Sequence, residues 1–422
     1  MDFRFNVNGM VNINRIINVS LAFDYMFVFL FALLPILMNY RGLIINASVT
    51  VVVVIVPYAV YKILTKRYIS VNSFRVLLPL ALFWLFKIID HGTNVIEVSQ
   101  VFVYIVLLIV FAAGCIKPGL LINVAIKIAC LACICIFFQY ICYYILGFHL
   151  RLAPINYLLD GAQQWSLLAQ TGRISVTGRE IAFYRPSAFF LEPSHMFMYL
   201  FAPLYYELLT PDFGKEEKRI AILLSAGMIL STSGMGIMAT AIGWGIFILK
   251  SWLKSGRISL NKVFSIHNLV LLSVLLLLLV LSYYNVDFFQ RSVNRIFFSG
   301  SDYRNAVSSR LEGGTSFILQ MQGIEFLIGI ADHYAGLDFH MTGFNATMYK
   351  YGITGTLLSY FFYFKCVKDL KKQYFWLALV LIGTSFFMPH THGTFYMLFF
   401  VVFFLEGYRE RDRQALLQET RV

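Results

Sequence analysis

Three ionisable side chains, Arg185, Glu192 and His195, stand at the entrance to an apolar run in the stretch YRPSAFFLEPSHMFMYLFAPLY. Pro193 suits the first position of a helix, where its missing N–H leaves no hydrogen bond unmade. Glu192 then falls at the N-cap, and the positive helix end favours an anion, toward which Arg185 can fold back. A simple cap with an ion-pair partner is one interpretation. Because Ser or Asn would cap without bringing charges near lipid, we favour a polar site.

Further candidate residues surround a later apolar run. Arg304 and Arg310 are six residues apart, and His340 and Asn345 stand at the entrance to a predicted helix in HMTGFNATMYKYGITG. Lys350 lies about 7 Å deeper along that helix, and we expect it to face protein or a water-filled cavity. Arginine offers a planar fork of donors to phosphate or carboxylate oxygens, so the arginines indicate an anion site.

The sequence contains little that would indicate a metal site or a nucleotide-binding site. His390 and His392 form an H-x-H pair, but no carboxylate or thiol nearby completes a zinc site. Cys130 and Cys133 have the spacing of a redox or metal pair, yet their apolar neighbours favour packed core thiols. The chain contains no P-loop and no G-x-G-x-x-G sequence. We therefore predict no metal and no cofactor.

The composition indicates a membrane protein. Of the 422 residues, 59% are hydrophobic and 13% are charged, whereas a soluble domain carries about 25% charged residues. The apolar runs are close to the ~20 residues that cross a bilayer as a helix. We predict an all-α polytopic membrane protein, one transmembrane domain over residues 1–422, with about 12 transmembrane helices. The predicted spans are 18–38, 42–63, 75–90, 97–115, 119–147, 187–209, 219–233, 234–251, 266–286, 343–365, 373–389 and 391–407.

The basic residues determine the predicted orientation. The net charge is +12, and most lysines and arginines fall in connections that face the cytoplasm when both termini are cytoplasmic, as the positive-inside rule requires. This placement argues against nucleic acid as a partner. The turn STSGMG joins the spans 219–233 and 234–251, and a re-entrant arrangement of this pair is the alternative.

Two long connections, 148–186 and 287–342, face outward in this topology and contain arginine but no lysine. Long loops in compact domains are usually functional. Anion binding is one explanation of their arginines, and pairing with nearby acids or lipid headgroups is the other. In the second loop, Phe317, Met321, Ile324 and Leu327 recur at helical spacing, which predicts an amphipathic helix with either a packing role or a lid role. The loop arginines are Arg151, Arg173, Arg179, Arg185, Arg291, Arg295, Arg304 and Arg310.

Three stretches resemble the Wzy-type O-antigen and capsule polymerases, within the O-antigen polymerase–ligase superfamily of membrane glycosyltransferases. RPSAFFLEPSHMFMYL is similar to the family's arginine followed by Phe-x-Glu-Pro-Ser, and ILSTSGMGI to its Leu-Ser-x-Ser turn. SSRLEGGTSFILQMQGIEFLIGIAD with GFNATMYKYGITG resembles the outer-loop arginine, helix, Gly-x-Gly turn and Asn-(span)-Gly-x-x-Gly sequence. The turn reads Gly329-Ile330-Ala331 here. Phe344 precedes Asn345 where the ligases place a histidine, which favours polymerase over ligase.

The resemblance implies a GT-C-like fold in the bacterial inner (cytoplasmic) membrane, with both long loops periplasmic. It implies transfer of a growing glycan from undecaprenyl diphosphate onto a lipid-linked repeat unit. The expected partners are undecaprenyl-diphosphate-linked oligosaccharides and membrane lipids, with a chain-length regulator as a candidate protein partner. The alternatives are an O-antigen ligase that uses lipid A–core and a polysaccharide flippase or other transporter, although no internal repeat indicates transport. The candidate catalytic residues are Glu192, His340 and Arg304, and the candidate substrate-binding residues are Arg185, Arg310, His195, Asn345, Arg179 and Lys350.

Overall fold

The structure, a computed structural model, is mostly helical in the part of the chain that it describes, with turns between the helices, and no strand occurs there. This agrees with the all-α class that the sequence predicts. The described residues are 23–37, 47–66, 78–79, 82, 105–107, 109–110, 115–148, 150, 152, 186–190, 193–209, 214–255, 284, 290, 315–329, 341–369, 380, 382–383 and 385–386.

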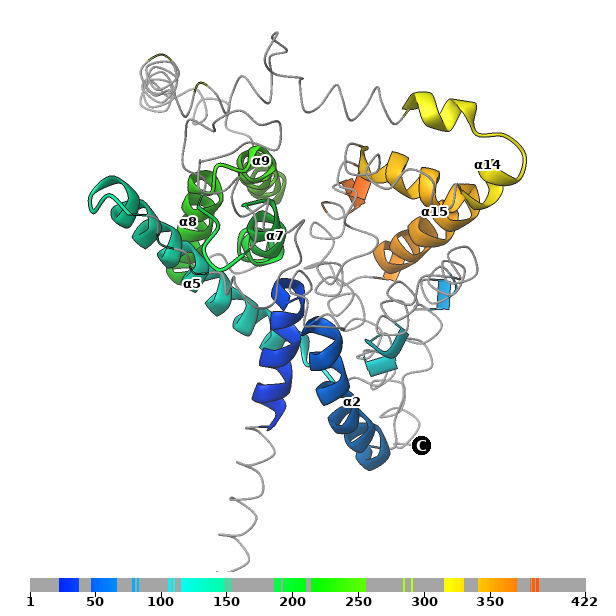
Figure 1. The fold of residues 1–422 in the computed structure, drawn as a ribbon, viewed down its shortest axis with the longest axis horizontal. Coiled ribbons are helices and arrows are strands. Elements are labelled where there is room, and N and C mark those ends of the chain that lie inside the picture. The colour runs from blue at the N-terminus through cyan, green and yellow to red at the C-terminus, as the bar shows by residue number, and fades with distance from the viewer. Residues whose placement is uncertain are drawn as a thin grey trace, which may run out of the picture.

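The labelled helices are α2 (Ala47–Lys66), α5 (Pro118–Tyr144), α7 (Pro193–Leu209), α8 (Lys215–Leu230), α9 (Gly234–Ser255), α14 (Ile324–Ile328) and α15 (Gly343–Asp369). Figure 1 shows α7, α8 and α9 grouped together, with α5 crossing beside them. The helix Phe23–Leu37 and α2 extend from this group and contribute to the same apolar core. In Figure 1, α14 and α15 lie on the other side of the molecule, packed against each other.

The central helix α7 begins at Pro193 and ends at Leu209, the bounds that its proline and its apolar run predict. Most of its side chains are buried, which a helix packed against several neighbours requires. The Tyr199 hydroxyl donates to the carbonyl oxygen of Ala32, 3.1 Å away in the helix Phe23–Leu37. The two helices are therefore joined by a buried hydrogen bond as well as by apolar packing.

A buried polar turn connects α8 to α9 at the predicted STSG sequence. Ser231, Thr232 and Ser233 are all buried, and Thr232 has the left-handed φ of 61°. The Ser231 hydroxyl donates to the carbonyl oxygen of Met228, at 2.8 Å. From α5, the Tyr140 hydroxyl donates to the carbonyl oxygen of Leu230, at 2.7 Å, so α5 supports the turn directly.

Helices α5 and α8 approach closely because a glycine faces a cysteine. A Cβ atom added to Gly227 would lie 2.2 Å from the Sγ atom of Cys133. Cys133 is fully buried in the apolar core. Its role as a packed core thiol, which its apolar neighbours predict, is confirmed.

Seven of the twelve predicted spans overlap helices of the structure, and the other five lie largely outside the described residues. The predicted bounds differ at places: 187–190 form a turn before α7, and 231–233 form the turn after α8. Among the residues described, one helix, Gly119–Tyr144, is long and apolar enough to cross a membrane. Its 26 residues extend roughly 39 Å at 1.5 Å per residue, against about 30 Å of hydrocarbon. Phe23–Leu37, Val51–Thr65 and Met235–Ser251 are shorter apolar helices. The number of twelve spans stays a prediction.

Candidate functional site

The backbone just before α7 forms a tight, buried turn. The Ser187 hydroxyl donates to the carbonyl oxygen of Phe190 at 2.7 Å, and the Phe190 N–H donates back to the carbonyl oxygen of Ser187 at 2.9 Å. Between them, Ala188 adopts a left-handed φ of 52°, which costs a residue with a Cβ about 1–2 kcal/mol. Further contacts must therefore hold this turn in place.

Gln139 of α5 supplies these contacts. Its Oε1 atom accepts a hydrogen bond from the Ala188 N–H at 2.9 Å, and its Nε2 atom donates to the carbonyl oxygens of Ala188 at 3.4 Å and Leu150 at 3.1 Å. The Gln139 residue is only 4% exposed. Leu150 stands near the start of the predicted loop 148–186, and Ala188 stands just beyond its end. One buried amide thus joins the two ends of the first long loop.

Asn345 connects α15 to the second long loop. The Thr342 hydroxyl accepts a hydrogen bond from the backbone N–H of Asn345 at 3.3 Å, the usual arrangement of a helix N-cap. The Nδ2 atom of Asn345 donates to the Thr315 hydroxyl oxygen at 3.3 Å. Asn345 is 8% exposed. The side chain that the sequence predicts for substrate binding is therefore held in place by the outer segment 315–329.

Two glycines bring the same segment into backbone contact with α15. Gly329 has a φ of 93°, and a Cβ there would lie 2.3 Å from the carbonyl carbon and oxygen of Lys350. Gly352 has a φ of 59° where α15 is kinked, and a Cβ there would lie 2.5 Å from the same backbone atoms of Leu327. Glycine alone permits both these conformations and this approach. The turn after α14 is thereby seated against the backbone of Lys350, which is itself half-buried.

The outer segment differs from the single amphipathic helix that the sequence predicts. It forms a helix over 315–320 and then α14, separated by Gly323 with its left-handed φ of 55°. Met321 is buried, and the ring of Phe317 lies 6.2 Å from that of Tyr349. Ile324, in contrast, is 70% exposed. Because Gly323 interrupts the helix, the apolar residues on either side of it no longer share one face.

Three of the nine predicted site residues, His195, Asn345 and Lys350, lie in the described part of the chain. Asn345 and Lys350 both lie in α15, and both contact the segment 315–329: Asn345 through its side chain and Lys350 through its backbone. His195 is half-buried in the first turn of α7, which Figure 1 shows apart from α15, so it does not join them. The six others, which lie outside the described residues, are Arg179, Arg185, Glu192, Arg304, Arg310 and His340.

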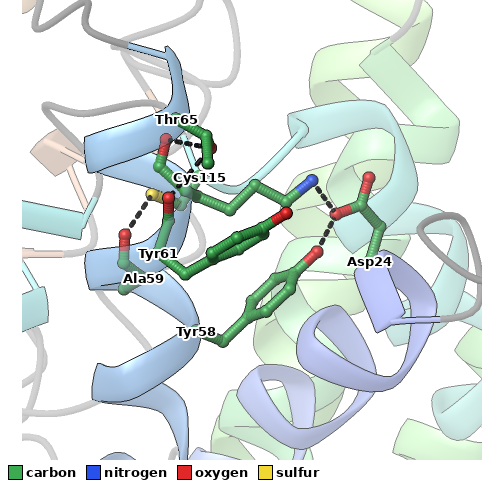
Figure 2. A network of polar contacts seen from close by, with 7 residues as sticks. Asp24, Tyr58, Ala59, Tyr61, Thr65 and Cys115 are labelled. Atoms are coloured by element: carbon green, nitrogen blue, oxygen red, sulfur yellow. Dashed lines mark hydrogen bonds and ion pairs between the residues drawn. The ribbon is translucent and has the colours of Figure 1, made fainter.

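A second polar cluster, between the helix Phe23–Leu37 and α2, is shown in Figure 2. The Nζ atom of Lys62 lies 2.6 Å from the Oδ1 atom of Asp24, and the side chains are 12% and 16% exposed. The Tyr58 hydroxyl donates to the same carboxylate oxygen, and the Lys62 ammonium lies 5.3 Å from the centre of the Tyr58 ring. Asp24 thus has an ion-pair partner on the neighbouring helix.

Neither Gln139 nor the Asp24–Lys62 pair is among the site residues that the sequence predicts. Each carries a signal of one kind: a polar or charged side chain inside an otherwise apolar helix, as in ICIFFQYICYY. Such residues in membrane helices usually face protein and have partners. The sequence does not tell which partner each one takes.

No group of three His, Cys, Asp or Glu side chains in the described ranges is arranged to hold a metal ion. Over the residues that the structure describes, the fold is all-helical, and one helix there has the length and composition of a membrane span. No known family model matches the chain, and a search of curated proteins finds no match. The family resemblance therefore stays a prediction from the motifs.

Proposed function

We propose that the protein is a polysaccharide polymerase of the O-antigen type. It transfers a growing glycan from undecaprenyl diphosphate onto a lipid-linked repeat unit at the periplasmic face of the bacterial inner membrane. The observation that supports this proposal is the joining of the segment 315–329 to the start of α15, through Asn345 and Gly352. The two parts of the third stretch that resembles the polymerases, one in the outer loop and one at the start of α15, lie against each other. A site built from both parts requires this.

In the proposed reaction, an acceptor hydroxyl oxygen attacks the anomeric carbon of the donor sugar. The bond between that carbon and the diphosphate oxygen breaks, and undecaprenyl diphosphate leaves with the electron pair. Glu192 is the first candidate to take the hydroxyl proton, and His340 is the second. Arg185, Arg304 and Arg310 form the proposed clamp that stabilises the negative charge developing on the diphosphate.

The remaining candidates orient the substrate. Asn345 is suited to this role because its amide is held at Thr315, so it loses little freedom when a glycan hydroxyl binds. Lys350 lies deeper along α15, beside the Gly329 turn, where a cation would add to the attraction of the diphosphate. His195 and Arg179 are proposed to contact the glycan from the side of α7 and of the first loop.

The proposal is tested with purified protein in lipid and a synthetic repeat unit on polyprenyl diphosphate, with products separated on a gel. We expect a ladder of lengthening lipid-linked glycans, lost in Arg304→Ala, Arg185→Ala and Glu192→Gln at normal protein levels. Lys215→Ala, which removes an exposed cation at the start of α8, is the matched control and should retain the ladder.

Other outcomes would contradict the polymerase proposal. Well-folded protein that makes no ladder from the authenticated native repeat unit would refute it. Transfer of the glycan to added lipid A–core would instead identify a ligase. Movement of the repeat unit across a vesicle membrane, without a new glycosidic bond, would identify a transporter.

A further inference from the structure

We propose that Gln139 is a positioning residue, which aligns the entrance to α7 by holding together the two ends of the first long loop. Its kinetic consequence rests on the proposed function, whereas its structural consequence can be measured without any activity. The proposal concerns α5, for which the motifs suggest no role in the site.

The geometry uses the full donor capacity of one side chain. A glutamine amide offers two N–H donors and one carbonyl oxygen. In Gln139 the carbonyl oxygen receives the Ala188 N–H, and the two donors serve the carbonyl oxygens of Ala188 and Leu150. Both backbone groups of Ala188 are therefore bonded to the same amide, in the way that a neighbouring strand would bond them. The left-handed φ of 52° at Ala188, unusual for alanine, is explained by this pair of bonds.

The hydrogen bonds from Gln139 to Ala188 are relevant to the proposed site because Ala188 lies between two predicted site residues in the chain. Arg185 precedes it by three residues and Glu192 follows it by four, so both predicted site residues are close in the chain to the turn that Gln139 holds. On the α7 side, the ring of Phe190 lies 5.4 Å from the ring of Tyr199, which anchors the turn to the helix. Gln139 itself sits within α5, whose own backbone hydrogen bonds do not depend on its side chain.

Packing alone is the competing explanation for Gln139. A side chain that only filled space could be exchanged for leucine with little effect, because an apolar group of similar size restores the contacts. A positioning residue behaves differently, since leucine leaves the Ala188 N–H and two carbonyl oxygens without their bonds. The two explanations therefore predict opposite results for Gln139→Leu.

The first measurement is hydrogen–deuterium exchange of the peptide that contains residues 186–190. We expect exchange there to be roughly tenfold faster in Gln139→Leu than in the wild type, because the amide hydrogen of Ala188 loses its acceptor. Tyr140→Phe is the control on the same helix, since it loses a hydrogen bond to Leu230 instead. It should leave this peptide unchanged. If Gln139→Leu does not fold, Gln139→Asn, shorter by one methylene group, should show the same faster exchange.

The second measurement is the kinetics of glycan extension. We expect Gln139→Leu to lower kcat/KM for the lipid-diphosphate donor, and we expect added Ala188→Gly to recover roughly fivefold or more, because glycine adopts a positive φ without Gln139. A role in packing would not give this recovery.

The outcomes separate the two proposals. Unchanged exchange at 186–190 in Gln139→Leu overturns the positioning role, whatever the activity. Faster exchange with unchanged kcat/KM in an active protein overturns it as well. A wild type that forms no ladder refutes only the polymerase, because the exchange experiment still decides whether Gln139 holds the turn.

Discussion

A single methyl group at Gly352 is predicted to separate the outer segment from α15. The φ of 59° and ψ of −168° at Gly352 fall in a region that is essentially restricted to glycine, so alanine there costs about 1–3 kcal/mol. The added Cβ would also lie 2.5 Å from the carbonyl group of Leu327 and 2.6 Å from the backbone nitrogen of Gly329. These are backbone atoms that cannot rotate away, and such overpacking costs a further ~1–3 kcal/mol. The total of about 2–6 kcal/mol is large beside the 5–15 kcal/mol of a typical domain.

The expected result of Gly352→Ala is a lower Tm for the purified protein in detergent, together with faster hydrogen exchange across 315–329. Gly245→Ala in α9 is the matched control, because nothing lies within 4 Å of a Cβ at that position. Its alanine should be neutral or should stabilise α9 by up to ~1 kcal/mol. If Gly352→Ala has the Tm and the exchange of the wild type, the close backbone approach to Leu327 does not exist.

Two further predictions concern pairs of residues. Lys62→Met leaves the Asp24 carboxylate without its ion-pair partner, and we expect it to lower the free energy of unfolding by about 1–3 kcal/mol. Asp24→Asn in the same chain should recover most of that loss, and strictly additive losses in a double-mutant cycle would show that the pair is not coupled. Gly227→Ala places a methyl group 2.2 Å from the Cys133 sulfur and should cost about 1–3 kcal/mol. Cys133→Ala in the same chain should restore part of it, and an equal loss with and without the sulfur would argue against this contact.

The Gly329–Gly352 contact and the Gln139 contact do the same thing in two parts of the molecule: each one fixes a loop segment to a helix. In each, a segment of a predicted outward loop is attached to a helix through backbone groups, so that the loop leaves the helix in a defined direction. The first contact holds the segment 315–329 at α15, and the second holds the turn before α7. The first predicted loop is therefore anchored at both of its ends, and the second is anchored within its length, at the segment 315–329.

The sequence by itself determined the local features of the fold. Apolar runs of about 20 residues predicted helices, and Pro193 predicted the start of α7 because proline is tolerated at the first helical position. The STSG sequence predicted the break between α8 and α9, and apolar neighbours predicted that Cys133 is a core thiol. These features depend on residues within a few positions of one another, and so a linear pattern records them.

Only the tertiary structure decided which distant residues meet. Gln139 hydrogen-bonds to the backbone of Leu150 and Ala188, and Asp24 forms an ion pair with Lys62. Gly352 lies against the backbone of Leu327. A lone glutamine in an apolar helix indicates that its amide has a hydrogen-bond partner, but not which one. A glycine in the sequence is equally compatible with a flexible backbone position and with close contact between two backbones. The choice follows from how the helices pack, because packing brings together groups whose spacing along the chain follows no period.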